Sequence, residues 1–174
     1  RGGYQTMEVS GTNNSGLSPT VFNSILSNTM RYEGFKATKS NGSVGYGWHE
    51  ASGDSVPDNL TPQQAQMHLK DLYEKRYIPM TKGYMKDAGI SGDTATSLLA
   101  DLAYQRPADA KALATAMGQF KRGEISPYEL SKVLPSLPSY KDAGGTEKTV
   151  RNMDRANALL RWSNFEGNPR VNNW

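Results

Sequence analysis

Residues 31–50 read RYEGFKATKSNGSVGYGWHE, and this stretch decides the expected fold. Glu33 stands directly before Gly34, and a glycine at this place is typical of the end of a helix. From 44 to 48 apolar residues alternate with glycines, which is the pattern of a short antiparallel hairpin or small sheet. The stretch therefore predicts a helix that ends at a glutamate, followed by a glycine-rich hairpin with 43–48 as its second strand.

The sequence before this stretch predicts one amphipathic helix. Ser18 is a typical N-cap, and Pro19 after it loses no hydrogen bond at the first helical position. Apolar side chains follow with helical spacing at Val21, Phe22, Ile25, Leu26 and Met30. Residues 1–17 are rich in Gly, Ser, Asn and Thr, so we expect a flexible arm or linker there and a single domain over 18–174.

The sequence after the hairpin predicts helices. Thr61, Pro62 and Gln64 form a capping box with proline in the first turn, and they open a long helix that Pro79 is expected to end or kink. Further helices are expected around 98–103, 113–120, 126–134 and 147–163, and the prolines and glycines of 135–145 are expected in a loop. The expected fold class is therefore α+β and mainly α, with a small hairpin between a first helix and an all-helical remainder.

The composition excludes several classes of protein. The chain of 174 residues has no Cys, which excludes a disulfide scaffold, a thiolate metal site and a cysteine nucleophile. No stretch approaches the ~18 uncharged apolar residues that a membrane span needs. The net charge of +3 is mild, and the scattered lysines and arginines without interleaved aromatics argue against a nucleic-acid site, which the charge alone would suggest. A slightly basic surface suits an anionic polymer such as peptidoglycan, and it suits an ordinary protein surface equally well.

The chain has two histidines, His49 and His68. His49 is adjacent to Glu50, and neighbours on a strand point to opposite faces of the sheet. We therefore expect no metal site and no cofactor, because a metal needs several ligands that converge on one point. The expected role of His49 is a structural hydrogen bond.

The position of Glu33 points to acid chemistry. The C-terminus of a helix disfavours a negative charge, typically by about 0.3–1 kcal/mol. The same field, together with the aromatic neighbours Tyr32 and Phe35, favours the protonated carboxyl group that a general acid needs. The alternative interpretation is a solvated surface glutamate.

The order of these pieces resembles the phage lysozyme family, glycoside hydrolase family 24, in which a helix ends in Glu-Gly and a hairpin with a Gly-x-Gly strand forms one wall of the cleft. The matching residues here are 31–34 and 43–47. The segments 60–65, 98–105 and 151–162 are similar in pattern to that family's inter-lobe helix, central buried helix and closing helix. The resemblance implies a lysozyme-like domain of two lobes joined by the inter-lobe helix, with glycosidase activity on the bacterial cell wall.

The resemblance also implies where such a domain acts. The expected partner is bacterial peptidoglycan, and the expected location is a virion or the host periplasm and cell wall. The chain opens with Arg1 rather than Met and shows no signal-like leader, which we interpret as a processed product or one domain of a longer virion or secreted polypeptide.

By this resemblance Glu33 is the catalytic acid that protonates the glycosidic oxygen between N-acetylmuramic acid and N-acetylglucosamine. Ser43 falls where the family keeps a threonine near the reacting carbon, and its hydroxyl would hold a water. The family also carries an aspartate between its two motifs. Here that interval is shorter, and 35–43 contains no carboxylate, so the usual second carboxylate is missing.

Because the usual second carboxylate is missing, three functions remain open. A hydrolase needs a second carboxylate, which Glu50, Asp54 or Asp58 would supply, Glu50 being the nearest in sequence. Alternatively, Glu33 alone acts first as acid and then as base, and the sugar's own hydroxyl attacks, which is the chemistry of a lytic transglycosylase. The third alternative is a non-catalytic module that binds glycan or protein. The hydroxyl of Ser43 favours hydrolysis.

Four more residues are predicted to bind the glycan. Tyr46 and Trp48 are expected on one face of the hairpin, where they either stack on sugar rings or pack against the first helix. The resemblance places Gln105 where it would hydrogen-bond an acetamido group. Arg155, with the other arginines of 151–161, is expected on a solvated face that tolerates anionic glycan, or alternatively in a salt bridge near the catalytic glutamate.

Overall fold

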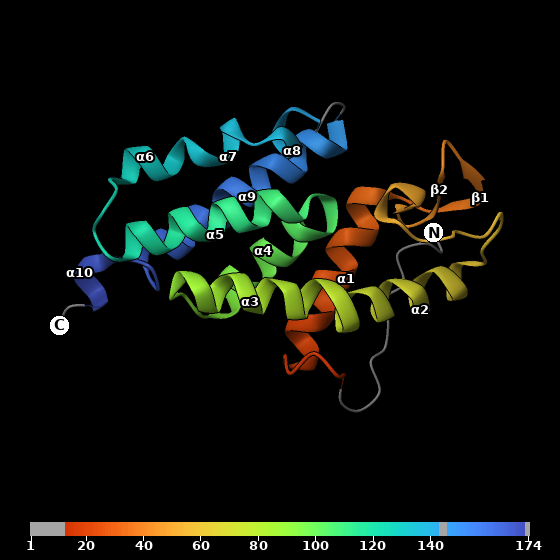
Figure 1. The fold of residues 1–174 in the computed structure, drawn as a ribbon, viewed down its shortest axis with the longest axis horizontal. Helices are drawn as coiled ribbons and strands as arrows, with labels where there is room; N and C mark the ends of the chain where they lie inside the picture. Colours follow the sequence, from red (N-terminus) through yellow and green to blue (C-terminus); the bar gives the residue numbers. More distant parts are fainter. Residues whose placement is uncertain (1–12, 143–145, 173–174) are drawn as a thin grey trace. The chain divides into compact units, whose positions relative to one another are not determined.

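The computed structural model describes residues 13–142 and 146–172, and it confirms the α+β, mainly α fold class. Helices follow one another along most of the chain, and one small antiparallel sheet of three strands comes after the first helix (Figure 1). The chain divides into two compact units, Arg1–Arg76 and Tyr77–Trp174. Within the described ranges, no helix is long and apolar enough to cross a membrane.

Among the described residues of the first unit, the helix α1 (Pro19–Glu33) comes first, and it has the predicted start and end. The Ser18 hydroxyl accepts a hydrogen bond from the Val21 N–H at 3.3 Å, and the Gly34 N–H donates to the Met30 carbonyl at 3.0 Å. The buried face includes Phe22, Ile25, Leu26 and Met30, which the spacing had singled out. The helix ends where predicted because Gly34 has a φ of 71°, a conformation that favours glycine.

The predicted flexible arm, 1–17, is described only in part, because 1–12 lie outside the described residues. Asn13 is 8% exposed, and its side-chain amide donates to a backbone carbonyl four residues later at 3.2 Å. The Asn14 N–H donates to Glu74 Oε2 at 2.7 Å. This end of the segment is therefore a turn held by asparagine, a residue that hydrogen-bonds its own backbone readily.

The sheet consists of β1 (Lys36–Ser40), β2 (Ser43–Gly45) and β3 (Trp48–His49), in that order. Asn41 and Gly42 connect β1 to β2 with φ values of 51° and 77°, which is the geometry of a tight two-residue hairpin. We predicted that 43–48 forms one strand, which is wrong. The chain turns again at Gly45 and Gly47, with φ values of 67° and 80°, because glycine alone adopts these conformations without strain.

The outer edge of β1 is covered by the segment 58–60. The Lys39 N–H donates to the Asp58 carbonyl at 2.7 Å, and the Leu60 N–H donates to the Ala37 carbonyl at 2.9 Å. The backbone of β1 is therefore hydrogen-bonded on both sides.

After η2 (Glu50–Ser52), the chain enters α2 (Pro62–Leu72), the π-helical η3 (Tyr73–Tyr77) and α3 (Ile78–Ala88). The predicted capping box is confirmed, since the Thr61 N–H donates to Gln64 Oε1 at 2.9 Å and the Gln64 N–H donates back to the Thr61 hydroxyl at 3.1 Å. Of the two outcomes predicted for Pro79, an end or a kink of the helix, the structure excludes the end, because the helical run continues through it. Pro79 lies in the first turn of α3, where no N–H is needed, and the wider π-helical turns precede it.

In the second unit, α4 packs mainly against three helices. They are α3, α5 (Pro107–Lys121) and α9 (Thr146–Asn164), and α4 itself covers Asp93–Gln105. The apolar residues predicted for α4 are buried, namely Leu98, Leu99, Leu102 and Ala103. The remaining helices are α6 (Pro127–Ser131), α7 (Val133–Ser136), α8 (Pro138–Lys141) and α10 (Pro169–Asn172).

The segment 126–142 departs from its prediction. The capping box of Ser126 and Glu129 is confirmed at the start of α6. Pro135 and Pro138 were expected in a loop, whereas Pro135 lies inside α7 and Pro138 begins α8. Each proline falls in the first turn of a short helix, where its missing N–H breaks no hydrogen bond. The glycines at 144 and 145, also expected in this loop, lie outside the described residues.

Candidate active site

Glu33 is the last residue of α1, and its half-buried side chain lies against the turn between β2 and β3. A Cβ atom placed on Gly47 would lie 2.6 Å from Glu33 Oε1 and 3.0 Å from its Cδ. The carboxyl group therefore occupies the space that any side chain at this position would need. The φ of Gly47 is 80°, which is a second and independent reason for glycine. The structure thus brings the predicted Glu-Gly helix end and the Gly-x-Gly turn into contact.

Two predicted site residues of the hairpin are buried. Ser43 is 8% exposed and pairs with His49 across β2 and β3. Tyr46 is 3% exposed, and its ring packs against Phe35 with 5.5 Å between centroids. Core packing, one of the two roles considered for Tyr46, agrees with this burial because a ring that stacks on sugar needs an open face.

Trp48 is half-buried and held on two sides. Its indole ring stacks on the imidazole of His68, with 3.4 Å between centroids and 25° between planes. Its Nε1–H donates to Asp54 Oδ2 at 3.0 Å. Arg76 donates to both oxygens of Asp54, at 3.1 and 3.2 Å, and Ser52 donates to Oδ2 at 3.2 Å. The hydrogen bonds from Arg76 and then from Trp48 lower the pKa of Asp54 to about 2.

The other two acidic side chains of this loop share one cation. Lys39 Nζ lies 3.1 Å from Glu50 Oε2 and 3.2 Å from Asp58 Oδ1. Hydrogen bonds to Glu50 and then to Asp58 raise the pKa of Lys39 above its ordinary value. All three carboxylates considered as the second catalytic group, Glu50, Asp54 and Asp58, therefore have a positively charged partner. Glu50 keeps half of its side chain exposed.

Sequence reasoning missed both of these cations. Lys39 and Arg76 were treated as scattered surface charges, whereas each holds carboxylates of the loop over 50–58. The density of acidic residues in that loop signals that a cation is needed, but it does not identify which one. The predicted structural role of His49 is confirmed, since its Nδ1 accepts a hydrogen bond from the Ala51 N–H at 2.9 Å and caps η2.

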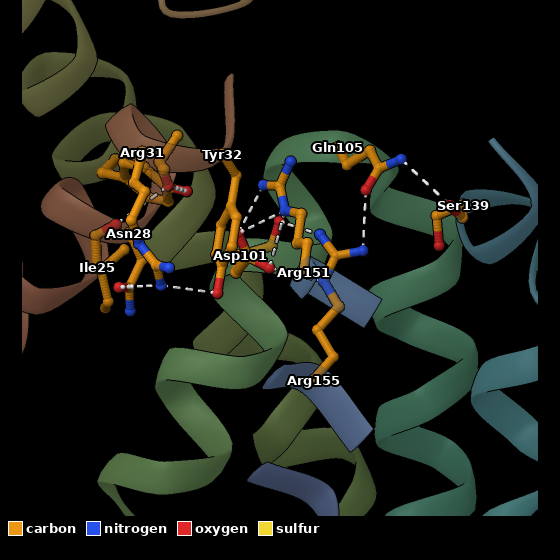
Figure 2. A network of polar contacts seen from close by, with 11 residues as sticks. Ile25, Asn28, Arg31, Tyr32, Asp101, Gln105, Ser139, Arg151 and Arg155 are labelled. Atoms are coloured by element: carbon orange, nitrogen blue, oxygen red, sulfur yellow. Dashed lines mark hydrogen bonds and ion pairs between the residues drawn. The ribbon is translucent and has the colours of Figure 1, made fainter. Parts of the chain in front are cut away.

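In the second unit, the predicted solvated arginine face is wrong for Arg151 and Arg155, which are 3% and 4% exposed. Their guanidinium groups converge on Asp101, with the shortest contacts at 2.6 Å from Arg151 Nη2 to Oδ1 and 2.6 Å from Arg155 Nε to Oδ2 (Figure 2). Burial alone raises the pKa of Asp101, but the two guanidinium charges outweigh it and hold the pKa below its ordinary value. Arg161 is exposed, as predicted.

Gln105 extends this network, as Figure 2 shows. Its Oε1 accepts a hydrogen bond from Arg155 Nη1 at 2.8 Å, and its Nε2 donates to the Ser139 carbonyl at 3.3 Å. The Ser139 N–H in turn donates to Asp109 Oδ2 at 2.8 Å. Gln105 therefore joins α4 to α9 and α8, and its contact with an acetamido group stays a prediction.

A groove of about 920 Å³ also lies in the second unit, and residues of α5 to α10 line it, with α8 contributing Tyr140 and α10 contributing Pro169 and Arg170. Its apolar wall includes Leu130, Leu134, Met153 and Leu160, and its lining, among the residues that the structure describes, holds no carboxylate. Over the same described ranges, no group of three or more His, Asp or Glu side chains is placed to hold a metal ion. The described lining of the groove therefore offers no carboxyl group, whereas the carboxyl group of Glu33 lies against the turn at Gly47.

The candidate site is defined by one contact in the first unit, that of the Glu33 carboxyl group with Gly47. The contact of a helix-ending glutamate with a glycine turn involves the residues that carry the resemblance described above, 31–34 and 43–47. Comparison of the chain with protein-family models, with curated proteins and with solved structures finds no match.

Proposed function

We propose that this chain cleaves the glycan strands of bacterial peptidoglycan, as a lysozyme-like muramidase with Glu33 as the general acid. The observation that carries the proposal is the contact between the Glu33 carboxyl group and Gly47. In this proposal the Glu33 carboxyl group, which is half-buried beside the hairpin, delivers a proton to the leaving oxygen. In this proposal the domain acts at the cell wall, as part of a phage virion or a secreted protein.

The proposed reaction begins with transfer of the Glu33 proton to the glycosidic oxygen, whose bond to the muramic acid C1 then breaks. In hydrolysis, a water attacks C1 and its proton passes to a carboxylate, for which Glu50 is the candidate because it is half exposed. Ser43 would help to hold that water.

The cation partners of the loop favour a second mechanism. Because Lys39 and Arg76 engage all three nearby carboxylates, a scheme that needs none of them is a specific alternative. In that scheme the C6 hydroxyl of the muramic acid attacks C1, and its proton returns to Glu33, which is now ionised. The product is an anhydro sugar, as formed by lytic transglycosylases.

The test is clearing of chloroform-treated Gram-negative cells, followed by mass spectrometry of the released muropeptides. Hydrolysis gives reducing ends, and transglycosylation gives products that are lighter by one water. If Glu50 is the base, Glu50→Gln lowers hydrolysis by about a hundredfold or more. Asp58→Asn is the matched control, because Asp58 binds the same ammonium group, and it should stay within a few-fold of the wild type. Wall binding without any cleavage would contradict the proposal and identify a binding module.

Gly47→Ala is expected to lower clearing activity by about tenfold to a hundredfold, because the new Cβ displaces the Glu33 carboxyl group from its position. It also forces a side chain into a left-handed conformation, at a cost of about 1–2 kcal/mol of stability. The measurements are the clearing rate and the free energy of unfolding.

Gly53→Ala is the control for Gly47→Ala. Gly53 has a φ of 91°, but no atom lies within 4 Å of the added Cβ. The Gly53→Ala variant should therefore lose about as much stability as Gly47→Ala does, and it should keep its clearing activity. Equal activity losses in the two variants would show that backbone strain, and not displacement of Glu33, is responsible.

A further inference from the structure

The side chain of His68 on α2 is half-buried, and the ring of Trp48 stacks on its imidazole ring. The two rings are stacked at 3.4 Å between centroids. The Nε2 atom of His68 is buried and has no hydrogen-bond partner. The surroundings of His68 therefore suit a neutral imidazole ring. They offer no hydrogen-bond acceptor for the second N–H of a protonated ring.

Three charged groups face His68 from the elements around it. Asp54 in the loop and Asp71 on α2 favour its protonation, whereas Arg76 on η3 opposes it. Asp54 is already bound to Arg76, Trp48 and Ser52, so its oxygens are occupied. Burial opposes protonation most strongly, and the pKa of His68 is held below its ordinary value.

We propose that His68 is an acid-sensitive latch on the β2–β3 hairpin: the neutral ring holds Trp48 against α2, and the protonated ring releases it. Release of Trp48 also frees its neighbour Gly47, on which the Glu33 carboxyl group rests. Acid pH would therefore displace the Glu33 carboxyl group from its position and lower the activity of the candidate site. This last consequence rests on the proposed function, whereas the latch itself does not.

The direction of the pH effect follows from the geometry. A released His68 takes up a proton near its ordinary pKa of 6.5, while the stacked ring resists until a lower pH. The stability of the stack is therefore complete above about pH 6.5 and is lost as the pH falls through the lower pKa of the stacked ring. An indole face attracts a cation, but here the added proton would leave a buried N–H without an acceptor. Asp54, with a pKa of about 2, stays ionised over this interval.

The experiment follows the hairpin directly in the wild-type protein. We would titrate the two histidine rings by NMR and measure amide protection factors in the β2–β3 ladder at about pH 7.5 and about pH 5. We expect His68 to titrate below 6.5 and hairpin protection to fall about tenfold or more at the lower pH, relative to α4. His68→Phe keeps a flat ring that takes up no proton, so its hairpin protection should not change with pH. His49→Asn, which keeps the cap acceptor, should behave as the wild type does.

Two results would overturn the latch. The first is a His68 ring that titrates above 6.5 in the folded protein, and the second is an equal loss of hairpin protection in His68→Phe. If His68→Phe fails to fold, the wild-type titration and exchange data still decide the question. A protein that shows the transition but never clears cell walls would retain the latch and lose the proposed function, which keeps the two claims separate.

Discussion

Glu33→Gln is expected to abolish clearing of cell walls, with a loss of about a hundredfold to ten-thousandfold, while the fold stays intact. The amide of glutamine has almost the shape of the carboxyl group, so it can lie against Gly47 in the same way. It has no acidic proton to give to the glycosidic oxygen. The measurements are the initial rate of clearing and the muropeptide yield, together with the thermal unfolding curve.

A cell-wall binding assay distinguishes this loss of clearing activity from a folding defect. Glu33→Gln should still sediment with purified cell walls, because only the proton donor is removed. Glu124→Gln is the control for loss of a carboxylate as such, since Glu124 is an exposed acid in the second unit that pairs with Arg122. A Glu33→Gln protein that clears cells within a few-fold of the wild-type rate would remove Glu33 from the mechanism.

The largest expected effect on stability comes from Asp101→Asn. The substitution leaves the guanidinium groups of Arg151 and Arg155 in place without the buried anion on which they converge. Removing one partner of a buried ion pair typically costs about 3–5 kcal/mol, because the remaining charge is no longer compensated. Urea unfolding of the two proteins at neutral pH would measure this difference.

Arg161→Gln gives the comparison for Asp101→Asn. Arg161 lies on α9, the helix that carries both buried arginines, but its side chain is exposed. Its substitution should change the free energy of unfolding by no more than about 0.5 kcal/mol. A loss below about 1 kcal/mol in Asp101→Asn would mean that other groups compensate the two cations, and that Asp101 is not central to this cluster.

The parts of the fold that were predicted from sequence depend on neighbouring residues. The caps at Ser18, Thr61 and Ser126 and the helix end at Gly34 each need only a few residues of local context, and all are confirmed. Helical spacing likewise identified the buried face of α1. The same local signals misled at Pro135 and Pro138, because proline is compatible with the first turn of a helix as well as with a loop.

The parts that could not be predicted depend on residues far apart in the chain. Arg151 lies 50 positions after Asp101, and no local pattern distinguishes an arginine that pairs with a buried aspartate from one in solvent. The cation partners of the acidic loop were missed for this reason too, since Arg76 is 22 positions from Asp54. The contact of Glu33 with Gly47 was not predicted either, because the sequence showed only the order of the two motifs that carry these residues.

The pairing of the segment 58–60 along β1 has a consequence for solubility. An unpaired strand edge is a template on which another chain can add a strand, and aggregation often begins there. Here the Lys39 N–H and the Ala37 carbonyl, which such a chain would capture, are already hydrogen-bonded to the segment 58–60 of the same molecule. The opposite edge, β3, spans two residues, which is too short to seed growth. So small a sheet can therefore stand at the surface without polymerising.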